Sequence, residues 1–400
     1  MTHILAFVSS SSVISNQFLY SNYSYGVLTI SSIPYEGTKF KPKKGCLNIE
    51  NVPVMHIFIL YKLQFFVISI VNQKQGKLNS RYLELKIGDK KLATPTYFPS
   101  ISTASTRMPY SSIIRTLVTS GFPQLLVSCY DLYKLRKEKE IFRYLGEHIE
   151  TKNLLFLDSG EFERYWFEST DWSFDKYKKT VEKINSDLFG SYDIIPTQQY
   201  EFEDVVTHTI QKTEASFELI NNNYCITIFH GDSPEELCKL INKVLSSHKE
   251  FFGMIAVAER ECGKMIEDKI KTVQKIREIL KQNSSNTILH VLGCGSPSSI
   301  ALLTFAGADS FDSFDWNRWI IDKKTMQFHD FANLTLLDCN CKGCSSTNRD
   351  SRERAMLHNL FFYQDFVYRL QRSIIDNEDI SLVLREYFDP KIVSKAANFF

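Results

Sequence analysis

The chain has 400 residues, of which 44% are hydrophobic and 23% are charged, and its formal net charge is +1. This is the composition of an ordinary soluble globular protein that can bury a full core. Its length fits one large α/β barrel with additions, or two domains. The near-neutral total excludes no class of partner, because it can hide a local basic face.

The cysteines and the N-terminus bear on the compartment. Cysteines at positions 46, 129, 225 and 262 stand singly with no paired spacing, which favours a reducing, cytoplasmic setting. The N-terminus lacks a basic segment followed by an apolar core and a small-residue cleavage site, so we expect no secretion signal. The most apolar window, residues 52–71, is interrupted by charged and polar side chains and favours buried strands over a membrane-spanning helix. We therefore expect no membrane association.

Taken in order, the chain divides into three predicted regions. Residues 1–77 are rich in Ser, Tyr, Asn and β-branched residues. We expect an N-terminal extension of unknown role there, either a small β appendage or a poorly ordered segment. Residues 78–335 are expected to form a barrel, and residues 336–400 a zinc-binding region with closing helices.

The barrel is predicted from the alternation of strands and helices. Residues 83–87 and 91–94 alternate like a hairpin, and apolar segments and amphipathic helices then follow at the spacing of a (β/α)8 TIM barrel, an α/β fold. The predicted strands are 95–101, 124–130, 154–158, 191–195, 225–229, 252–258, 288–292 and 309–314. The predicted helices are 111–119, 173–185, 202–221, 234–247, 264–282, 298–305, 358–377 and 379–388.

Three of the predicted strands carry an aspartate at or near their C-terminal ends, namely Asp158, Asp193 and Asp312. A single aspartate at such a place is most often a turn or cap residue. Three at equivalent positions favour a carboxylate site, because barrel enzymes place reactive residues at the C-terminal ends of strands. Two carboxylates can divide a substitution at an acetal-like carbon, one as nucleophile and one as acid and base.

A metal site is predicted near the C-terminus. Cys339, Cys341 and Cys344 form a C-x-C-x2-C array, and His358 follows fourteen residues later. Three thiolates and an imidazole make a tetrahedral zinc set. Because four protein ligands close the coordination sphere, we expect the zinc to be structural.

The order of these motifs resembles the tRNA-guanine transglycosylases, the queuine and archaeosine tRNA-ribosyltransferases. The resemblance covers roughly residues 80–370. It rests on Pro95-Thr-Tyr-Phe-Pro99, Asp158-Ser-Gly160, Asp187, Asp193, Pro196-Thr197, Gly231, Gly253, Ala256-Val257, Glu259, Gly293-Cys-Gly-Ser-Pro297, Phe311-Asp312, the cysteine array and His358-Asn-Leu360.

The resemblance implies a zinc-containing barrel that exchanges a guanine in a nucleic acid for a 7-deazaguanine of the preQ0, preQ1 or queuine type. Asp312 would attack C1′ of the target nucleoside and form a covalent intermediate. Asp158 would protonate the departing base and then deprotonate the incoming one, and Asp193 would bind the base's N–H edge. The other implied substrate-binding residues are Ser159, Gly160, His230, Gly231, Gly253, Ala256, Val257 and Glu259.

The sequence departs from the family pattern around the base. Glu161 and Glu163 replace a glycine and a glutamine, and His230 stands where a glutamine contacts the base. Met254 replaces the second of two glycines in a strand, which would narrow the slot if its side chain pointed inward.

The sequence indicates the kind of nucleic acid less clearly than it indicates the reaction. tRNA is the default substrate, but of the elements that follow the nucleophile in the tRNA enzymes only Arg318 aligns. A DNA-modifying (DpdA-like) branch of the family and a non-catalytic accessory subunit therefore stay open as alternatives. Candidate contacts to the nucleic-acid backbone are Arg318, Lys342, Arg349 and Arg352. The tRNA enzymes pair through the zinc side, so a homodimer is also open.

Overall fold

The computed structural model describes residues 68–104, 108–195, 201–219, 224–247, 253–283 and 286–397. Residues 1–67 lie outside the described part, and with them most of the predicted N-terminal extension and of the apolar window at 52–71. Residues 196 and 197, which contribute to the family pattern, also lie outside it.

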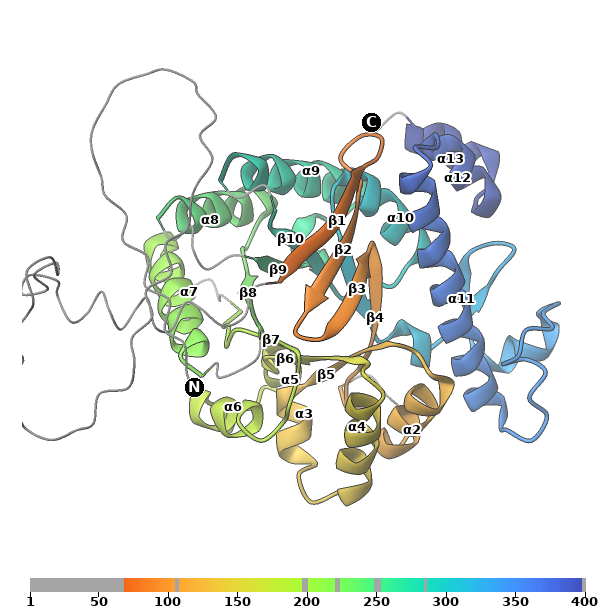
Figure 1. Ribbon diagram of the computed structural model, residues 1–400, viewed down its shortest axis with the longest axis horizontal. Coiled ribbons are helices and arrows are strands. Elements are labelled where there is room, and N and C mark those ends of the chain that lie inside the picture. Colours follow the sequence, from red (N-terminus) through yellow and green to blue (C-terminus); the bar gives the residue numbers. More distant parts are fainter. Residues whose placement is uncertain are drawn as a thin grey trace, which may run out of the picture. The chain divides into compact units, whose positions relative to one another are not determined.

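Eight parallel strands close into a barrel in the order β10-β11-β4-β5-β6-β7-β8-β9, with helices around it (Figure 1). The predicted α/β barrel is therefore confirmed. The barrel strands are β4 (Thr96–Ile101), β5 (Gln124–Ser128), β6 (Leu154–Asp158), β7 (Leu188–Gly190), β8 (Tyr224–Phe229), β9 (Met254–Ala258), β10 (Ile288–Leu292) and β11 (Ser310–Ser313).

One predicted strand is displaced. We expected residues 191–195 to form it, but β7 ends at Gly190. The reason is that the backbone beyond Ser191 turns to side chains: Tyr192 N donates to Ser216 Oγ at 2.9 Å, and Ile195 N donates to Glu161 Oε1 at 3.2 Å. Asp193 therefore lies in a loop just past the strand, where the alternating side-chain directions of a strand no longer apply.

Side chains alternate between the barrel interior and the helix layer, as the two-residue period of a strand requires. Phe98, Phe156 and Ile288 belong to an interior cluster, and their neighbours Leu155 and Leu289 belong to the cluster that packs against the helices. Along each strand, every second side chain faces the interior as far as the mouth of the barrel. This alternation therefore fixes which strand-end residues face the cavity described below.

An antiparallel sheet packs against one end of the barrel. It consists of β1 (Ser69–Gln75), β2 (Arg81–Ile87) and β3 (Lys90–Thr94) in the order β1-β2-β3. Leu83, Leu85 and Leu92 join the interior cluster of the barrel, so this sheet closes its floor. β1 lies within the range predicted as the N-terminal extension, and it pairs with β2.

The floor also holds a buried ionic cluster. Asp309 is fully buried and accepts hydrogen bonds from Arg81 Nε at 2.7 Å and from Arg277 Nη2 at 2.6 Å. Both guanidinium groups also donate to Thr287 O. The cluster ties β2, α9 (Ile266–Asn283) and the residue before β11 together at the end of the barrel opposite the mouth.

The helices around the barrel vary in length. They are α2 (Tyr110–Ser120), α3 (Cys129–Lys134), α4 (Lys139–Glu150), α5 (Glu161–Trp166), α6 (Phe174–Val181), α7 (Phe202–Phe217), α8 (Pro234–Ser247), α9 (Ile266–Asn283) and α10 (Pro297–Ala306), with the 3-10 turns η2 (Glu259–Cys262) and η3 (Asp315–Asn317). We did not predict α3, α4 or α5, and α3 and α5 are only six residues long. Such short helices carry too few turns for a clear helical period.

The C-terminal region packs on the barrel beside β4 and α2. It contains β12 (Ile320–Asp322), β13 (Gln327–His329), the turn η4 (Phe331–Leu336), α11 (Ser351–Ile375), α12 (Ile380–Tyr387) and α13 (Pro390–Ala397). α11 begins seven residues before the predicted start at His358, because the Asp350 side chain caps it by accepting from Arg352 N and Glu353 N. Within the described residues, no helix is both long enough and apolar enough to span a membrane.

Candidate active site and metal centre

A cavity of about 290 Å³ opens at the C-terminal ends of the barrel strands. Strand-end side chains and the loops after them form its wall. The lining residues that face it from the strands and their ends are Ser100, Ser102, Leu126, Ser128, Asp158, His230, Ala258, Leu292, Asp312 and Phe314. Those that reach it from loops and helices include Ser159, Phe162, Glu163, Asp193, Ile195, Glu259, Arg260, Lys269 and Gly293.

Asp312 projects into this cavity from β11 and is held by two donors. Its Oδ1 atom accepts from Gly293 N at 3.0 Å and lies 3.2 Å from His290 Nε2. The other ring nitrogen of His290 lies 2.7 Å from Ser310 Oγ. Since both bonds use Oδ1, the second oxygen of Asp312 is left to face a ligand.

His290 is a site residue that was not among the predicted ones. It is fully buried in the middle of β10, two residues before Leu292, which lines the cavity. The two-residue period of a strand could have indicated that both face inward. The structure places this histidine directly beneath Asp312, where it orients the carboxylate.

Asp158 ends β6, and a tight turn holds it at the cavity. Gly160 N donates to Asp158 Oδ2 at 3.2 Å, and Gly160 has φ 89° with a Cβ position only 2.6 Å from Tyr130 N. Only glycine fits there. Burial, followed by the negative charge of Asp193, raises the pKa of Asp158 to about 7. This carboxyl can therefore hold and release a proton near neutral pH.

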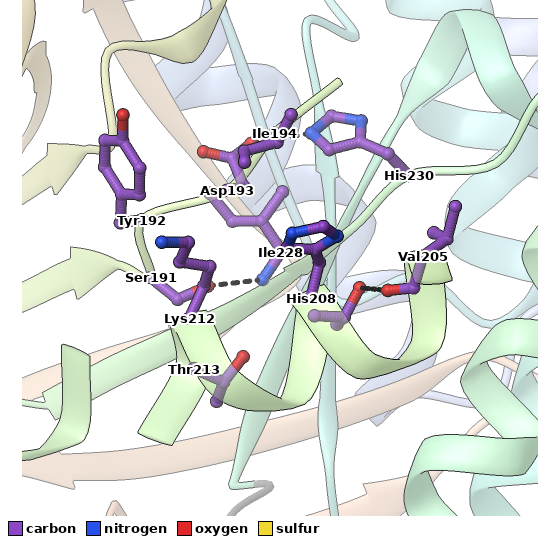
Figure 2. Close-up of a pocket in the computed structure, with 11 residues that line it drawn as sticks. Ser191, Tyr192, Asp193, Ile194, Val205, His208, Lys212, Thr213, Ile228 and His230 are labelled. Atoms are coloured by element: carbon purple, nitrogen blue, oxygen red, sulfur yellow. Dashed lines mark hydrogen bonds and ion pairs between the residues drawn. The ribbon is translucent and has the colours of Figure 1, made fainter. Parts of the chain in front are cut away.

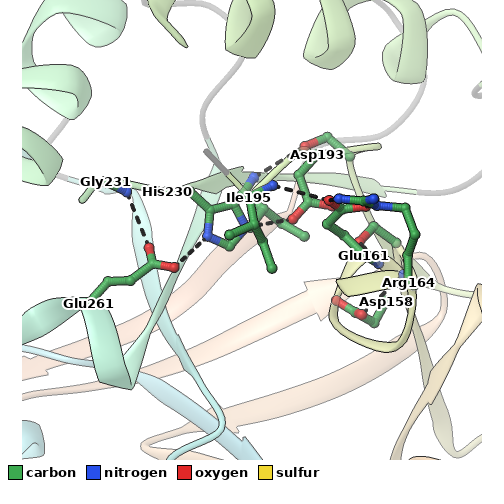
Figure 3. A network of polar contacts seen from close by, with 12 residues as sticks. Asp158, Glu161, Arg164, Asp193, Ile195, His230, Gly231 and Glu261 are labelled. Atoms are coloured by element: carbon green, nitrogen blue, oxygen red, sulfur yellow. Dashed lines mark hydrogen bonds and ion pairs between the residues drawn. The ribbon is translucent and has the colours of Figure 1, made fainter. Parts of the chain in front are cut away.

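In another part of the site, His230 lies between Asp193 and Glu261 and contacts both (Figure 3). His230 Nε2 lies 2.6 Å from Asp193 Oδ2, and His230 Nδ1 lies 2.8 Å from Glu261 Oε1. Burial alone lowers the pKa of His230, but the charge of Glu261 and the hydrogen bonds with Asp193 and Glu261 raise it to about 10. His230 is therefore an imidazolium that donates to one carboxylate on each side.

Asp193 is left with one oxygen for a ligand. The residue is 8% exposed, and its Oδ1 atom is buried with no hydrogen-bond partner in the described part of the chain. Asp193 and His230 also line a smaller hollow toward α7, which at about 30 Å³ has room for little more than a water molecule (Figure 2). A buried carboxylate oxygen without a donor is costly, so the atom favours a ligand that brings an N–H group.

The two glutamates that depart from the family pattern both point inward. Glu163 hydrogen-bonds the hydroxyls of Ser102 and Ser128, each at 2.6 Å, and burial raises its pKa well above the usual range. Glu161 accepts from Arg164 at 2.5 Å. Glu163 lines the cavity and was not among the predicted site residues, although the sequence marked its position as unusual.

The structure does not bring every expected substrate-binding residue to the cavity. Gly253 precedes β9 at the floor end of the barrel, Ala256 belongs to the interior cluster below the mouth, and Val257 faces the helix layer. Ala258, at the end of β9, lines the cavity together with the predicted Glu259.

Two further expectations concern glycine and methionine. Gly231 packs against the start of α8, where a Cβ would lie 2.6 Å from Leu237 N, and its own N–H donates to Glu261 Oε2 at 3.2 Å. Met254 lies at the start of β9 in the interior cluster and not among the cavity-lining residues. Its side chain therefore does not narrow the slot.

The four predicted backbone contacts fall in two places. Arg318 follows β11 at the mouth, with its guanidinium 5.3 Å from the centre of the Phe314 ring. Lys342, Arg349 and Arg352 lie in the segment of the cysteine array and the first turn of α11. Lys342 and Arg352 are exposed, while Arg349 lies 3.8 Å from Glu353.

The predicted metal ligands converge. The Nδ1 atom of His358 lies 3.4, 3.5 and 3.2 Å from the Sγ atoms of Cys339, Cys341 and Cys344. A tetrahedral zinc with bonds of about 2.3 Å to sulfur and about 2.0 Å to nitrogen separates such atoms by about 3.5 Å. His358 Nε2 donates to Ile321 O at 2.7 Å, which leaves the Nδ1 lone pair for the ion. These four residues fit a zinc ion.

Comparisons with known proteins agree on one family. Residues 77–387 match the family model described as queuine tRNA-ribosyltransferase. A protein named tRNA-guanine(15) transglycosylase from Methanococcus aeolicus is 22% identical over 332 residues, which cover 75% of this chain and 49% of the relative. The protein of the same name from Methanococcus vannielii is 25% identical over 329 residues, covering 75% and 49%.

The corresponding protein from Methanocaldococcus jannaschii is 23% identical over 333 residues, which cover 75% of this chain and 48% of the relative. The chain thus spans about half the length of the curated relatives it matches. The matched half contains the barrel, the cavity with its three aspartates and the cysteine–histidine cluster.

Proposed function

The chain belongs to the queuine tRNA-ribosyltransferase family, as the order of its motifs predicted, and we propose that it exchanges a guanine in a nucleic acid for a 7-deazaguanine. The observation that carries the proposal is the convergence of Asp158, Asp193 and Asp312 on one cavity at the barrel mouth. Each carboxyl has a different environment, which is what a site needs when it assigns different roles to similar groups.

The first displacement uses Asp312 and Asp158. The Asp312 carboxylate attacks C1′ of the target nucleoside, the C1′–N9 bond breaks, and its electron pair goes to the departing guanine. Asp158 gives that base a proton, so guanine leaves as a neutral molecule and the sugar stays as an ester on Asp312. A pKa of about 7 for Asp158 and donors on only one oxygen of Asp312 support these roles.

The second displacement reverses the first with another base. N9 of the incoming 7-deazaguanine attacks C1′, its proton passes to Asp158, and the Asp312 carboxylate is released. Because Asp158 starts protonated and ends protonated, the enzyme needs no further acid or base. Microscopic reversibility makes the exchange of guanine for guanine the simplest reaction to follow.

Base recognition is assigned to Asp193. Guanine and its 7-deaza analogues share an edge with a ring N–H and an exocyclic amino group, both donors. The unpartnered Oδ1 of Asp193 is the acceptor for that edge, and His230, which also contacts Glu261, holds Asp193 in position. The 7-substituent lies away from this edge, so one site can take both the outgoing and the incoming base.

His230 therefore has a role different from that of the glutamine it replaces. Both of its ring nitrogens are engaged by carboxylates, which leaves no donor for the base. We assign it to holding Asp193. The replacement of glutamine by His230 therefore changes the side chains that hold Asp193, while Asp193 itself stays as the acceptor for the base.

The metal has a structural part in this proposal. Zinc bound to Cys339, Cys341, Cys344 and His358 would fasten the loop after η4 to α11, and none of these four ligands lines the cavity. The division into a barrel at 78–335 and a metal-binding region at 336–400 is proposed on the same ground.

tRNA is the proposed polymer, and DNA is the second candidate. Trp316 and Asn317 replace residues that hold the anticodon loop in the tRNA enzymes, and Trp316 is fully buried with its Nε1 donating to Ser100 O at 2.8 Å. A buried indole cannot contact a polymer, so this chain holds its nucleic acid by other means. The presence of both Asp158 and Asp312 argues against a non-catalytic accessory subunit.

Incorporation of labelled guanine tests the proposal. The protein is incubated with isotopically labelled guanine and either unmodified tRNA or double-stranded DNA. Asp312→Asn is the inactive variant, and Asp315→Asn, three residues along and outside the cavity lining, is the matched control. We expect label in tRNA, lost only in the Asp312 variant. Label in DNA alone selects the second candidate, and label in neither polymer with zinc bound contradicts the proposed function.

A further inference from the structure

Three large aromatic residues stand exposed in succession at the end of α5. Tyr165, Trp166 and Phe167 are 47%, 60% and 46% exposed. Single exposed aromatics are common, but a run of three is a patch, and such patches usually mark a binding surface. The proposed chemistry uses none of these residues.

The patch is continuous with the wall of the cavity. α5 begins directly after the turn at Gly160, and Phe162 lines the cavity. The Phe162 ring stacks on Trp166 with centroids 6.1 Å apart and planes inclined by 11°, and it lies 5.9 Å from the Phe314 ring. Aromatic faces therefore run without interruption from the cavity to the surface.

A cation lies beside the patch on its cavity side, while the exposed Glu168 follows Phe167 at its other end. Arg260 lines the cavity, is about half exposed, and places its guanidinium 5.6 Å from the centre of the Tyr165 ring. Its Nε atom is 3.7 Å from Glu261. The acids of α5 point inward instead: Glu161 pairs with Arg164, and Glu163 bonds to serines inside the mouth. An approaching phosphate thus meets the Arg260 guanidinium beside the Tyr165 ring.

We propose that Trp166, flanked by Tyr165 and Phe167, is a stacking platform for a nucleotide adjacent to the target nucleotide. The inference rests on the proposed function, because a target base must leave its stack to enter the cavity. Its neighbour then has an uncovered face, which an exposed ring at the rim can cover. Every base has such a face, so the contact is independent of sequence.

This occupant fits better than a second copy of the chain. A stable protein interface needs about 800 Å² on each partner and depletes charge at its centre. Here a single turn of helix is exposed, with Arg260 beside it, at the edge of an opening that must admit a polymer. A partner subunit seated on this turn would obstruct the cavity.

Three variants test the platform. Trp166→Ala removes the ring, Trp166→Phe keeps a smaller one, and Tyr368→Ala removes a ring that is 62% exposed on α11. Trp166 is on the surface, so circular dichroism should show an unchanged fold. The measurements are the KM for the polymer, the KM for free guanine, kcat, and the affinity for short guanine-containing RNA and DNA strands by fluorescence anisotropy.

We expect Trp166→Ala to raise the polymer KM and weaken oligonucleotide binding about tenfold, as the loss of one stacked base would. The KM for free guanine and kcat should hold, Trp166→Phe should recover most of the loss, and Tyr368→Ala should behave as wild type. An unchanged polymer KM with active enzyme overturns the platform and leaves the proposed function standing. So does a change in oligomeric mass without a change in binding.

The two proposals can fail separately. If wild-type protein exchanges no base but binds the strands in a Trp166-dependent way, the proposed function fails and the stacking surface stands. If exchange proceeds and strand binding ignores Trp166, the reverse holds. The binding assay and the exchange assay therefore report on different claims.

Discussion

His230 lies between two carboxylates, and its replacement by glutamine should be strongly destabilising near neutral pH. The imidazole is 7% exposed, and its pKa rises from 6.5 to about 10 in the folded protein. A shift of this size corresponds to roughly 5 kcal/mol of preference for the protonated form. Removing one partner of a buried ion pair costs about 3–5 kcal/mol, which is the same range.

The pH dependence of this loss has a definite sign. A group whose folded pKa is raised contributes its full stability below the unfolded pKa and loses it as the pH rises through the folded pKa. The advantage of wild type over His230→Gln should therefore be nearly constant below about pH 6.5. It should then fall by about 1.4 kcal/mol per pH unit toward pH 10.

Urea unfolding followed by circular dichroism at several pH values between 7.5 and 10 measures this difference. Taking wild type minus variant cancels the titration of the other groups. Tyr368→Ala, which removes an exposed side chain of α11, is the control and should show no pH-dependent difference. A wild-type advantage that stays flat across this interval would refute the reasoning, because His230 would then be neutral in the folded protein.

Three other predictions address the acid, the metal and the barrel floor. The rate of the first displacement should fall as the pH rises through about 7, the pKa of Asp158. In Asp193→Asn this fall should occur at lower pH, because the variant lacks a negative charge that raises the pKa of Asp158. Single-turnover rates measured across the pH range test both expectations. Metal analysis should find about one zinc ion per chain in wild type and less in Cys344→Ser, and the variant should have a lower Tm. Asp309→Asn should cost about 3–5 kcal/mol in urea unfolding, because it leaves Arg81 and Arg277 buried without a carboxylate.

The sequence predicted the parts of the fold that depend on local periodicity. The helix over residues 234–247 and the strands at 154–158 and 288–292 have the predicted bounds, because a helical apolar period marks the first and short apolar runs mark the other two. The metal cluster was also predictable, since ligand type and spacing together specify its geometry. The candidate acids at the strand ends followed once the strands were placed.

What the sequence did not indicate depends on contacts across the chain. β7 is only three residues long, and the backbone after it bonds to side chains from α5 and α7, which no local pattern reports. Glu261 lies in a 3-10 turn after β9 and meets His230, 31 positions earlier. The sequence also did not indicate that β9 ends at Ala258, which places Ala258 and Glu259, and not Ala256 or Val257, at the cavity.

The histidine at position 230 depends on the glutamate at position 261. A histidine placed against Asp193 without a second carboxylate would be a buried cation with a single partner. Glu261 supplies the second partner, and it also accepts from Gly231 N, so the turn after β8 is fixed by the same group. The consequence reaches across the cavity, because the negative charge of Asp193 is one of the causes that raise the pKa of Asp158. His230 and Glu261 therefore hold a carboxylate that the proposed mechanism uses twice: as the acceptor for the base, and as a charge that raises the pKa of the proposed acid.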